Sequence, residues 1–228
     1  AMVVVITIVL INCALYITSN LLIYFFKYDF GGDTWYNSYT LFNTFGGAIQ
    51  ILSMMLFFPF MRKVLTTTQV FFTGMTMAIT GYATLLVLMI CNINNILVLF
   101  IPGFLVFTAF GLLTVLTTVF LANTVDYGEL KNSRRDESVI FSMQTFVVKL
   151  ASGVSALIAS ICLSVFNISD NTDNVVASAS FSSVLGLRMT MTLLPIVGFV
   201  IALLVFKKKF ILTEAKVNSI TMELKERK

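Results

Sequence analysis

The sequence has no histidine, few charges and few cysteines, and each shortage excludes a class of chemistry. Without imidazole, no histidine can bind a metal, shuttle a proton or act as a catalytic base. The three cysteines, Cys13, Cys91 and Cys162, lie far apart in or beside apolar runs and match no metal-ligand spacing, so we expect apolar packing for all of them. Only 11% of the residues are charged, against roughly 25% in an ordinary soluble domain. These absences argue against an enzyme, a metal site and a soluble fold.

Apolar residues make up 58% of the chain, including 22 phenylalanines, which predicts an integral membrane protein in a lipid bilayer. A helix needs about 20 apolar residues to cross a hydrocarbon core. Six segments have this length, at approximately 2–26, 38–61, 69–91, 96–122, 139–166 and 184–206. The predicted fold class is therefore an all-α membrane protein with six transmembrane helices.

The positions of lysine and arginine predict the orientation of these spans. The second and fourth connections and the tail carry most of the basic residues, whereas the opposite side holds only Lys27 and Arg188, at span ends where they can snorkel. We therefore expect both termini to be cytoplasmic, in the plasma (inner) membrane. The net charge of +4 then reflects topology and not a nucleic-acid partner. Asp29 is assigned to a turn between the first two spans.

Six spans with both ends on one side fit a bundle of two three-helix repeats, which is how one half of a twelve-span transporter is built. Residues 1–206 would form this bundle. Residues 207–228 are predicted to be a basic amphipathic tail, which either lies on the anionic inner leaflet or is a solvated cytoplasmic helix.

Lys149 is the only charge that these spans leave deep inside a membrane helix. An ammonium in hydrocarbon costs roughly 3 kcal/mol on insertion scales, so this residue must face protein or a water-filled cavity. Helical periodicity brings Ser142, Thr145 and Ser152 to its face, with Gln144 beside it. Such a face suits a polyhydroxylated or anionic solute, and we predict a substrate site of Lys149, Gln144, Thr145 and Ser152. The alternative is a static packing role.

The connection over residues 123–138 holds four acids and three bases. Acids contribute little to orientation, so their presence indicates ion pairs that form and break as a transporter changes state. We predict a cytoplasmic gate of Asp126, Glu129, Arg134 and Arg135. A solvated charged loop is the alternative.

Two motifs within residues 123–153 resemble those of a known family. They read NTVDYGELK and RRDESVIFSMQTFVVKLASG. Both are similar to the segment joining helices ten and eleven of the glycoside–pentoside–hexuronide:cation symporters, with the melibiose carriers nearest. The resemblance implies the C-terminal six-helix bundle of a major-facilitator-type transporter, which moves a sugar or glycoside together with a cation by alternating access.

The resemblance also implies roles for single residues. The lysine of the Q-T-x-V-V-K run lines the sugar cavity in that family, which implies this role for Lys149, with Gln144 and Thr145 beside it. The family's inner gate corresponds to Asp126, Glu129 and Arg135. Two features depart from the pattern: Asn123 stands where an acid is common, and the fourth predicted span contains no tryptophan. The identity of the sugar is therefore not predicted.

No aspartate or glutamate lies within the six predicted spans. A buried cation site normally includes a carboxylate, so we expect the coupling cation, H⁺ or Na⁺, to bind in an N-terminal six-helix half, the partner of this chain. No other cofactor is expected. The alternative function is a stand-alone six-span homodimeric channel or membrane scaffold, in which two copies of Lys149 would repel each other across one pore.

Overall fold

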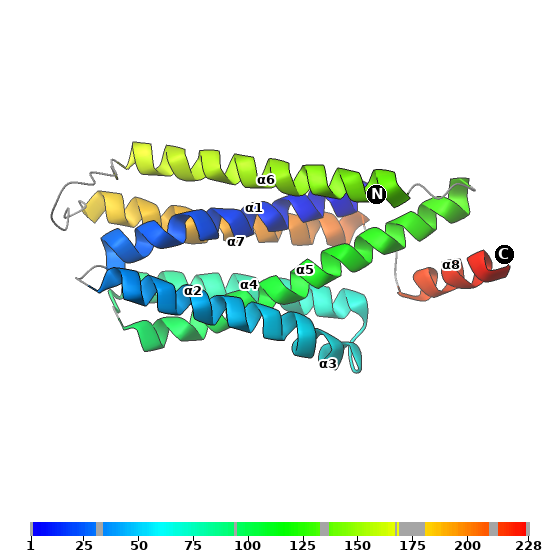
Figure 1. The fold of residues 1–228 in the computed structure, drawn as a ribbon, viewed down its shortest axis with the longest axis horizontal. Helices are drawn as coiled ribbons and strands as arrows, with labels where there is room; N and C mark the ends of the chain where they lie inside the picture. Colours follow the sequence, from blue (N-terminus) through cyan, green and yellow to red (C-terminus); the bar gives the residue numbers. More distant parts are fainter. Residues whose placement is uncertain are drawn as a thin grey trace.

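The chain folds into a bundle of long helices in the computed structural model (Figure 1). The structure describes residues 2–30, 34–93, 95–132, 137–166, 168, 181–209 and 214–226. Its elements are α1 (Met2–Tyr24), η1 (Phe25–Phe30), α2 (Trp35–Leu52), η2 (Ser53–Phe57), α3 (Phe58–Arg62), α4 (Thr67–Ile90), α5 (Ile96–Asn132), α6 (Glu137–Val165), α7 (Phe181–Lys209) and α8 (Glu214–Glu226), of which η1 and η2 are π-helical. The described residues contain no strand, and the predicted all-α class is confirmed.

Six of the described helical stretches are long and apolar enough to cross a membrane. They cover Val3–Phe30, Trp35–Arg62, Thr67–Ile90, Ile96–Lys131, Glu137–Val165 and Phe181–Lys208. Their number and order match the expectation, and the largest difference is the end of the fourth span, at Lys131 where residue 122 was expected. The division into two three-helix repeats stays a prediction.

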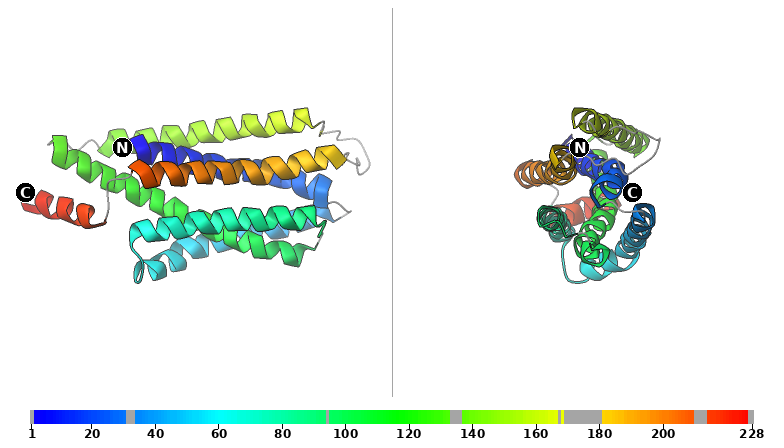
Figure 2. Two further views of the ribbon diagram at one scale, coloured as in Figure 1. Left: turned by 180° about the vertical axis from the view of Figure 1, so that it is seen from behind. Right: turned by 90° about the vertical axis from the view of Figure 1, so that its left-hand side faces the viewer.

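The six helices pack as an elongated bundle with α2 and α6 on its two flanks (Figure 2). The α1 helix packs against α6 and α7, α4 packs against α5 and α7, and α2 packs against α5. The most apolar 18-residue stretch is 17% buried in the span of α2 and 28% buried in α6. In the other four spans the buried share is 33–56%. These two flanking helices are therefore the least covered by the rest of the chain.

Aromatic rings fill the centre of the bundle. The centroid of the Phe71 ring in α4 lies 4.2 Å from the ring centroid of Phe206 in α7 and 5.4 Å from that of Phe120 in α5. Farther along α4, the fully buried Tyr82 shares a hydrogen bond with Thr18 of α1. These contacts join α1, α4, α5 and α7 into one core.

The contact between α1 and α6 depends on small side chains. Ala151, Ser155 and Ala159 lie one turn apart along α6, and all three are buried. Ser155 Oγ donates to the carbonyl oxygen of Cys13 in α1 at 3.2 Å and to that of Ala151 at 2.6 Å. Small residues with one such hydroxyl let two membrane helices approach closely.

Replacing Ser155 with leucine should therefore destabilise the bundle by about 1–3 kcal/mol, the usual cost of overpacking a close contact. Thermal unfolding of the purified protein in detergent measures this change. Ala156 is the matched control because it follows on the same helix and is exposed, so Ala156→Leu should leave the melting temperature unchanged. Equal melting temperatures for the two variants would show that the contact is not tight.

The α5 helix corrects the prediction of a charged loop over residues 123–138. It runs for 37 residues to Asn132, which at 1.5 Å per residue is about 55 Å, against about 30 Å for a hydrocarbon core. The helix continues because Leu121 and Val125, one turn apart, are both still buried, at 1% and 2% exposure. Residues 123–132 are thus the helical end of α5.

Two of the four predicted gate residues lie on this end of α5. Asp126 and Glu129 are three residues apart, so they share a face of the helix, and both are half-buried. Arg134 and Arg135 lie outside the described residues. The gate therefore stays a prediction, now with its acids on a helix.

The α8 helix packs against the same end of α5, and both chain ends lie at this end of the bundle (Figure 1). Lys216 Nζ lies 5.8 Å from the centroid of the Tyr127 ring. Ile220, an apolar residue of the predicted amphipathic tail, is only 4% exposed. The Ile220 side of the tail is therefore covered by protein and not by lipid or water.

Candidate functional site

A polar cavity of about 430 Å³ opens between α1, α2, α5 and α6. This volume lies within the usual range for small-molecule sites, about 300–1,000 Å³. Its lining residues are Ile11, Asn12, Leu15, Tyr16, Ser19, Gln50, Thr114, Thr117, Thr118, Gln144 and Val148. None of these carries a formal charge, so the wall consists of amides, hydroxyls and aliphatic groups.

The polar wall comes mainly from one face of α1 and one face of α5. Residues 12, 16 and 19 in α1 are four and three positions apart, and residues 114, 117 and 118 in α5 follow the same helical spacing. Asn12 lies ten residues into α1, about 15 Å along the helix, which is half of the about 30 Å of a hydrocarbon core. The cavity is therefore at mid-bundle.

Some polar side chains of the cavity already form hydrogen bonds within the protein, and others do not. Thr114 Oγ1 donates to the carbonyl oxygen of Phe110 at 2.8 Å, and Thr117 Oγ1 donates to that of Thr114 at 2.9 Å. Their protons are used within α5, which leaves the hydroxyl oxygens as acceptors. In contrast, the side-chain amides of Gln50 and Gln144 have no hydrogen-bond partner among the described residues, so they offer both donors and acceptors.

Contacts between α2 and α5 bring Gln50 to this cavity. The two helices approach so closely that a Cβ on Gly111 of α5 would lie 2.6 Å from the Gln50 carbonyl oxygen and 2.6 Å from Ser53 Cβ. Only glycine fits such an approach. Ser53 Oγ also donates a 2.7 Å hydrogen bond to the carbonyl oxygen of Thr108. The π-helical segment η2 begins at this serine, and π-helical turns are frequent at functional sites.

The predicted site residues on α6 divide between the cavity and a neighbouring surface. Val147 and Ala151 are buried against the bundle, and Gln144 and Val148 line the cavity. At about 100° per residue, the positions farther round the helix in the same direction are Ser152, Thr145 and Lys149. Gln144 is thus the one predicted residue that lines the cavity, and the other three lie on the adjoining face.

Lys149 lies about opposite the buried face of α6. It is exposed, and it has no hydrogen-bond or ion-pair partner among the described residues. Thr145 is also exposed, and its hydroxyl donates to the carbonyl oxygen of Phe141 at 3.1 Å. The ammonium therefore faces away from the helices described here.

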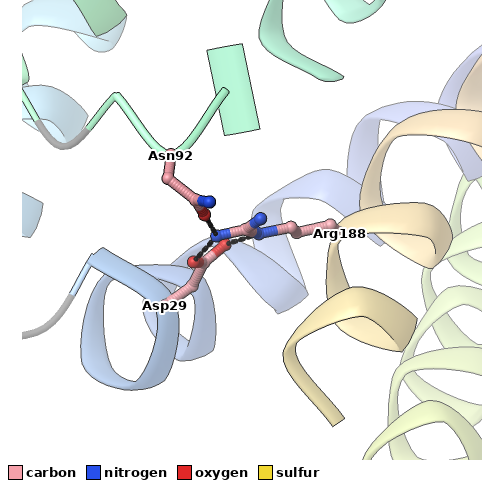
Figure 3. Close-up of polar contacts among 3 residues, drawn as sticks. All are labelled: Asp29, Asn92 and Arg188. Atoms are coloured by element: carbon pink, nitrogen blue, oxygen red, sulfur yellow. Dashed lines mark hydrogen bonds and ion pairs between the residues drawn. The ribbon is translucent and has the colours of Figure 1, made fainter. Parts of the chain in front are cut away.

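A second buried polar cluster joins the ends of α1, α4 and α7 at the opposite end of the bundle from the termini (Figure 3). Arg188 Nε and Nη2 donate to the two carboxylate oxygens of Asp29 at 2.8 and 2.6 Å. Nη2 also donates to Asn92 Oδ1 at 2.9 Å. The side chains of Arg188 and Asp29 are 8% and 3% exposed.

This cluster corrects two expectations from the sequence. Arg188 does not snorkel at a span end, and Asp29 is not in a turn, because η1 continues the first helix to Phe30. An acid therefore does lie within a membrane-length helix. Since Arg188 neutralises it, this carboxylate is not a free cation ligand.

Sequence reasoning missed the polar residues of α1, α2 and α5 that line the cavity. The signal was present as hydroxyl and amide side chains inside apolar runs, since polar groups at membrane depth usually mark a functional site. Because these side chains carry no charge, they stand out less in an apolar run than Lys149 does. Their helical spacing in α1, at residues 12, 16 and 19, would have identified that face.

Comparison with known proteins supports one family. Residues 1–210 match the family model described as MFS/sugar transport protein. The chain is 27% identical to the lactose permease of Lactobacillus delbrueckii subsp. bulgaricus over 205 residues, which are 89% of this chain and 31% of that protein. It is 30% identical to the isoprimeverose transporter of Lactiplantibacillus pentosus, over 83% of this chain and 38% of that protein.

A third relative is the raffinose carrier protein of Pediococcus pentosaceus, 28% identical over 91% of this chain and 31% of that protein. The chain therefore spans about a third of the length of the curated relatives that it matches. The resemblance drawn from residues 123–153 is confirmed by these matches. The chain belongs to the MFS/sugar transport protein family of integral membrane proteins.

Proposed function

We propose that this chain forms the C-terminal six-helix bundle of a secondary active transporter that carries a sugar or glycoside across the plasma (inner) membrane by alternating access. The observation that carries this proposal is the uncharged polar cavity at mid-bundle. Amides and hydroxyls can each pair with the hydroxyls of a neutral sugar, whereas the cavity has no charged group to attract an ion. The named substrates of the relatives, lactose, isoprimeverose and raffinose, are all sugars.

The partner that completes the site is an N-terminal six-helix half of the same transporter. The least covered helices, α2 and α6, flank the cavity, and each continues its polar surface outward. On α6 this surface carries Lys149, Thr145 and Ser152, and on α2 it carries the exposed Asn43 and Thr44. Such a surface is costly against lipid and favourable against a second polar wall. Lys149 would then donate to sugar hydroxyls, or to an acid, across the completed cavity.

The coupling cation, H⁺ or Na⁺, would bind in that second half. The cavity described here has no carboxylate, and the buried Asp29 is already paired with Arg188. With both termini cytoplasmic, the α5 end that carries Asp126 and Glu129 would lie at the inner mouth. These acids would form and break ion pairs there as the two halves rock.

We predict that residues 1–228 alone will not accumulate sugar, whereas the whole gene product will. The test uses proteoliposomes with an imposed Na⁺ or H⁺ gradient and radiolabelled lactose, raffinose and isoprimeverose. Labelled leucine controls for leak. Gradient-driven uptake by residues 1–228 alone would contradict the assignment of the cation site to the other half. No uptake of any of the three sugars by the whole protein would count against the proposed substrate class.

A further inference from the structure

We infer that Gln50 selects among sugars by hydrogen bonding one substrate hydroxyl, and that the contact of α2 with Gly111 sets its position. This inference rests on the proposed function, because it assigns a role to one residue of the proposed sugar cavity. Gln50 is the residue through which α2 contributes to the cavity wall.

The first argument is that the Gln50 amide is available to a ligand. It is half-buried, lines the cavity and has no hydrogen-bond partner among the described residues. Once a sugar covers this amide, leaving it without a hydrogen bond would be costly. A bound hydroxyl can supply that bond, since an amide offers an N–H donor and a carbonyl acceptor together.

The second argument is that the backbone of Gln50 is held in place. Its carbonyl oxygen lies against Gly111, where a Cβ would be only 2.6 Å away. Three residues later, Ser53 Oγ is hydrogen-bonded to the Thr108 carbonyl oxygen at 2.7 Å. A helix fixed at two successive points cannot rotate freely, so the neighbouring Ile49 and Ile51 cannot replace the amide at the cavity wall.

The third argument concerns selectivity. The Thr114 and Thr117 hydroxyls donate to carbonyls of α5, so toward a ligand they act as acceptors. Gln50 of the neighbouring α2 adds a donor. A site built to bond one hydroxyl discriminates against the analogue that lacks it, because the protein group is then left unpaired.

The test measures equilibrium binding of lactose, raffinose, isoprimeverose and their single-deoxy analogues to the purified whole transporter. For Gln50→Leu we expect up to about tenfold weaker binding of the parent sugar, the value of one neutral hydrogen bond. The deoxy analogue that lacks the hydroxyl bonded by Gln50 should bind wild type and variant equally. Leu41→Ala, on the same helix, exposed and about opposite Gln50, is the matched control and should change neither value. An equal loss for every analogue, or no loss at all, would overturn the role of Gln50.

The positioning role is tested by Gly111→Ala against Gly47→Ala. An added Cβ at Gly47 of α2 meets nothing within 4 Å, so this variant should bind the whole panel like wild type. Gly111→Ala should reproduce the altered selectivity of Gln50→Leu, because α2 must move. If Gly111→Ala does not fold, Ser53→Ala, which removes only the hydrogen bond to Thr108, should give a smaller shift in the same direction. Wild-type selectivity in the folded positioning variants would refute this part of the inference.

The proposed function and the role of Gln50 can be refuted separately. If the wild-type transporter binds none of the sugars, the proposed function fails. If it binds a sugar and Gln50→Leu binds the panel identically, only the inference about Gln50 fails.

Discussion

Replacing Arg188 with alanine is expected to destabilise the bundle by about 3–5 kcal/mol, the usual cost of removing one partner from a buried ion pair. Asp29 is 3% exposed, so the variant would leave a carboxylate buried without its counter-charge. The same substitution removes the bond to Asn92, whose φ of 52° places it in the left-handed region. Three helix ends would therefore lose their common contact, and the melting temperature in detergent should fall strongly.

Three further variants separate this explanation from a general loss of charge. Lys208→Ala removes an exposed base from the same helix and should leave the melting temperature unchanged. Arg188→Lys keeps the charge but cannot form the bidentate contact, so it should lie between wild type and alanine. The double variant Asp29→Leu with Arg188→Met should be more stable than Arg188→Ala, because no unpaired charge remains buried. A double variant less stable than the single one would contradict the ion-pair explanation.

Replacing Lys149 with alanine should weaken sugar binding and leave stability intact. We expect about 10- to 100-fold weaker sugar binding and an unchanged melting temperature. The expected loss corresponds to one hydrogen bond from a charged group, about 1.5–3 kcal/mol. Stability should not change because Lys149 is exposed and has no partner among the described residues. Binding of lactose, raffinose and isoprimeverose to the whole transporter measures the first effect, and thermal unfolding measures the second.

The neighbouring Leu150→Ala is the control for the Lys149 variant, since Leu150 is exposed on the apolar side of α6 and should affect neither measurement. Lys149→Arg should retain part of the binding because the charge is kept. If Lys149→Ala binds sugar like wild type, the residue is not part of the substrate site. If its melting temperature falls by several degrees, the lysine has a structural partner in the whole protein.

Lys149 and Arg188 show which features of the polar sites can be predicted from the sequence and which cannot. Lys149 stands out in the sequence because a charge in the middle of an apolar run is visible without any structure. Gln144 was found beside it and does line the cavity. The pair of Arg188 with Asp29 is not visible in the sequence, which predicts a turn at Asp29 where the structure has the π-helical end of the first span. The sequence likewise gives no clear sign of the helical end of α5, because Gly128 is unfavourable in a helix and the segment is highly charged.

The sequence by itself determined the class of molecule, the six membrane-length helices and the membership of a sugar-transport family. Hydrophobicity summed over a span of about 20 residues is enough for the first two, and a motif for the third. Only the tertiary structure decided which polar residues share a cavity and which charge is paired. Both depend on contacts between distant helices, as Arg188 and Asp29 are 159 positions apart. Gln50 lines the cavity from α2, whose backbone meets a glycine on α5 close by, a contact that no local pattern encodes.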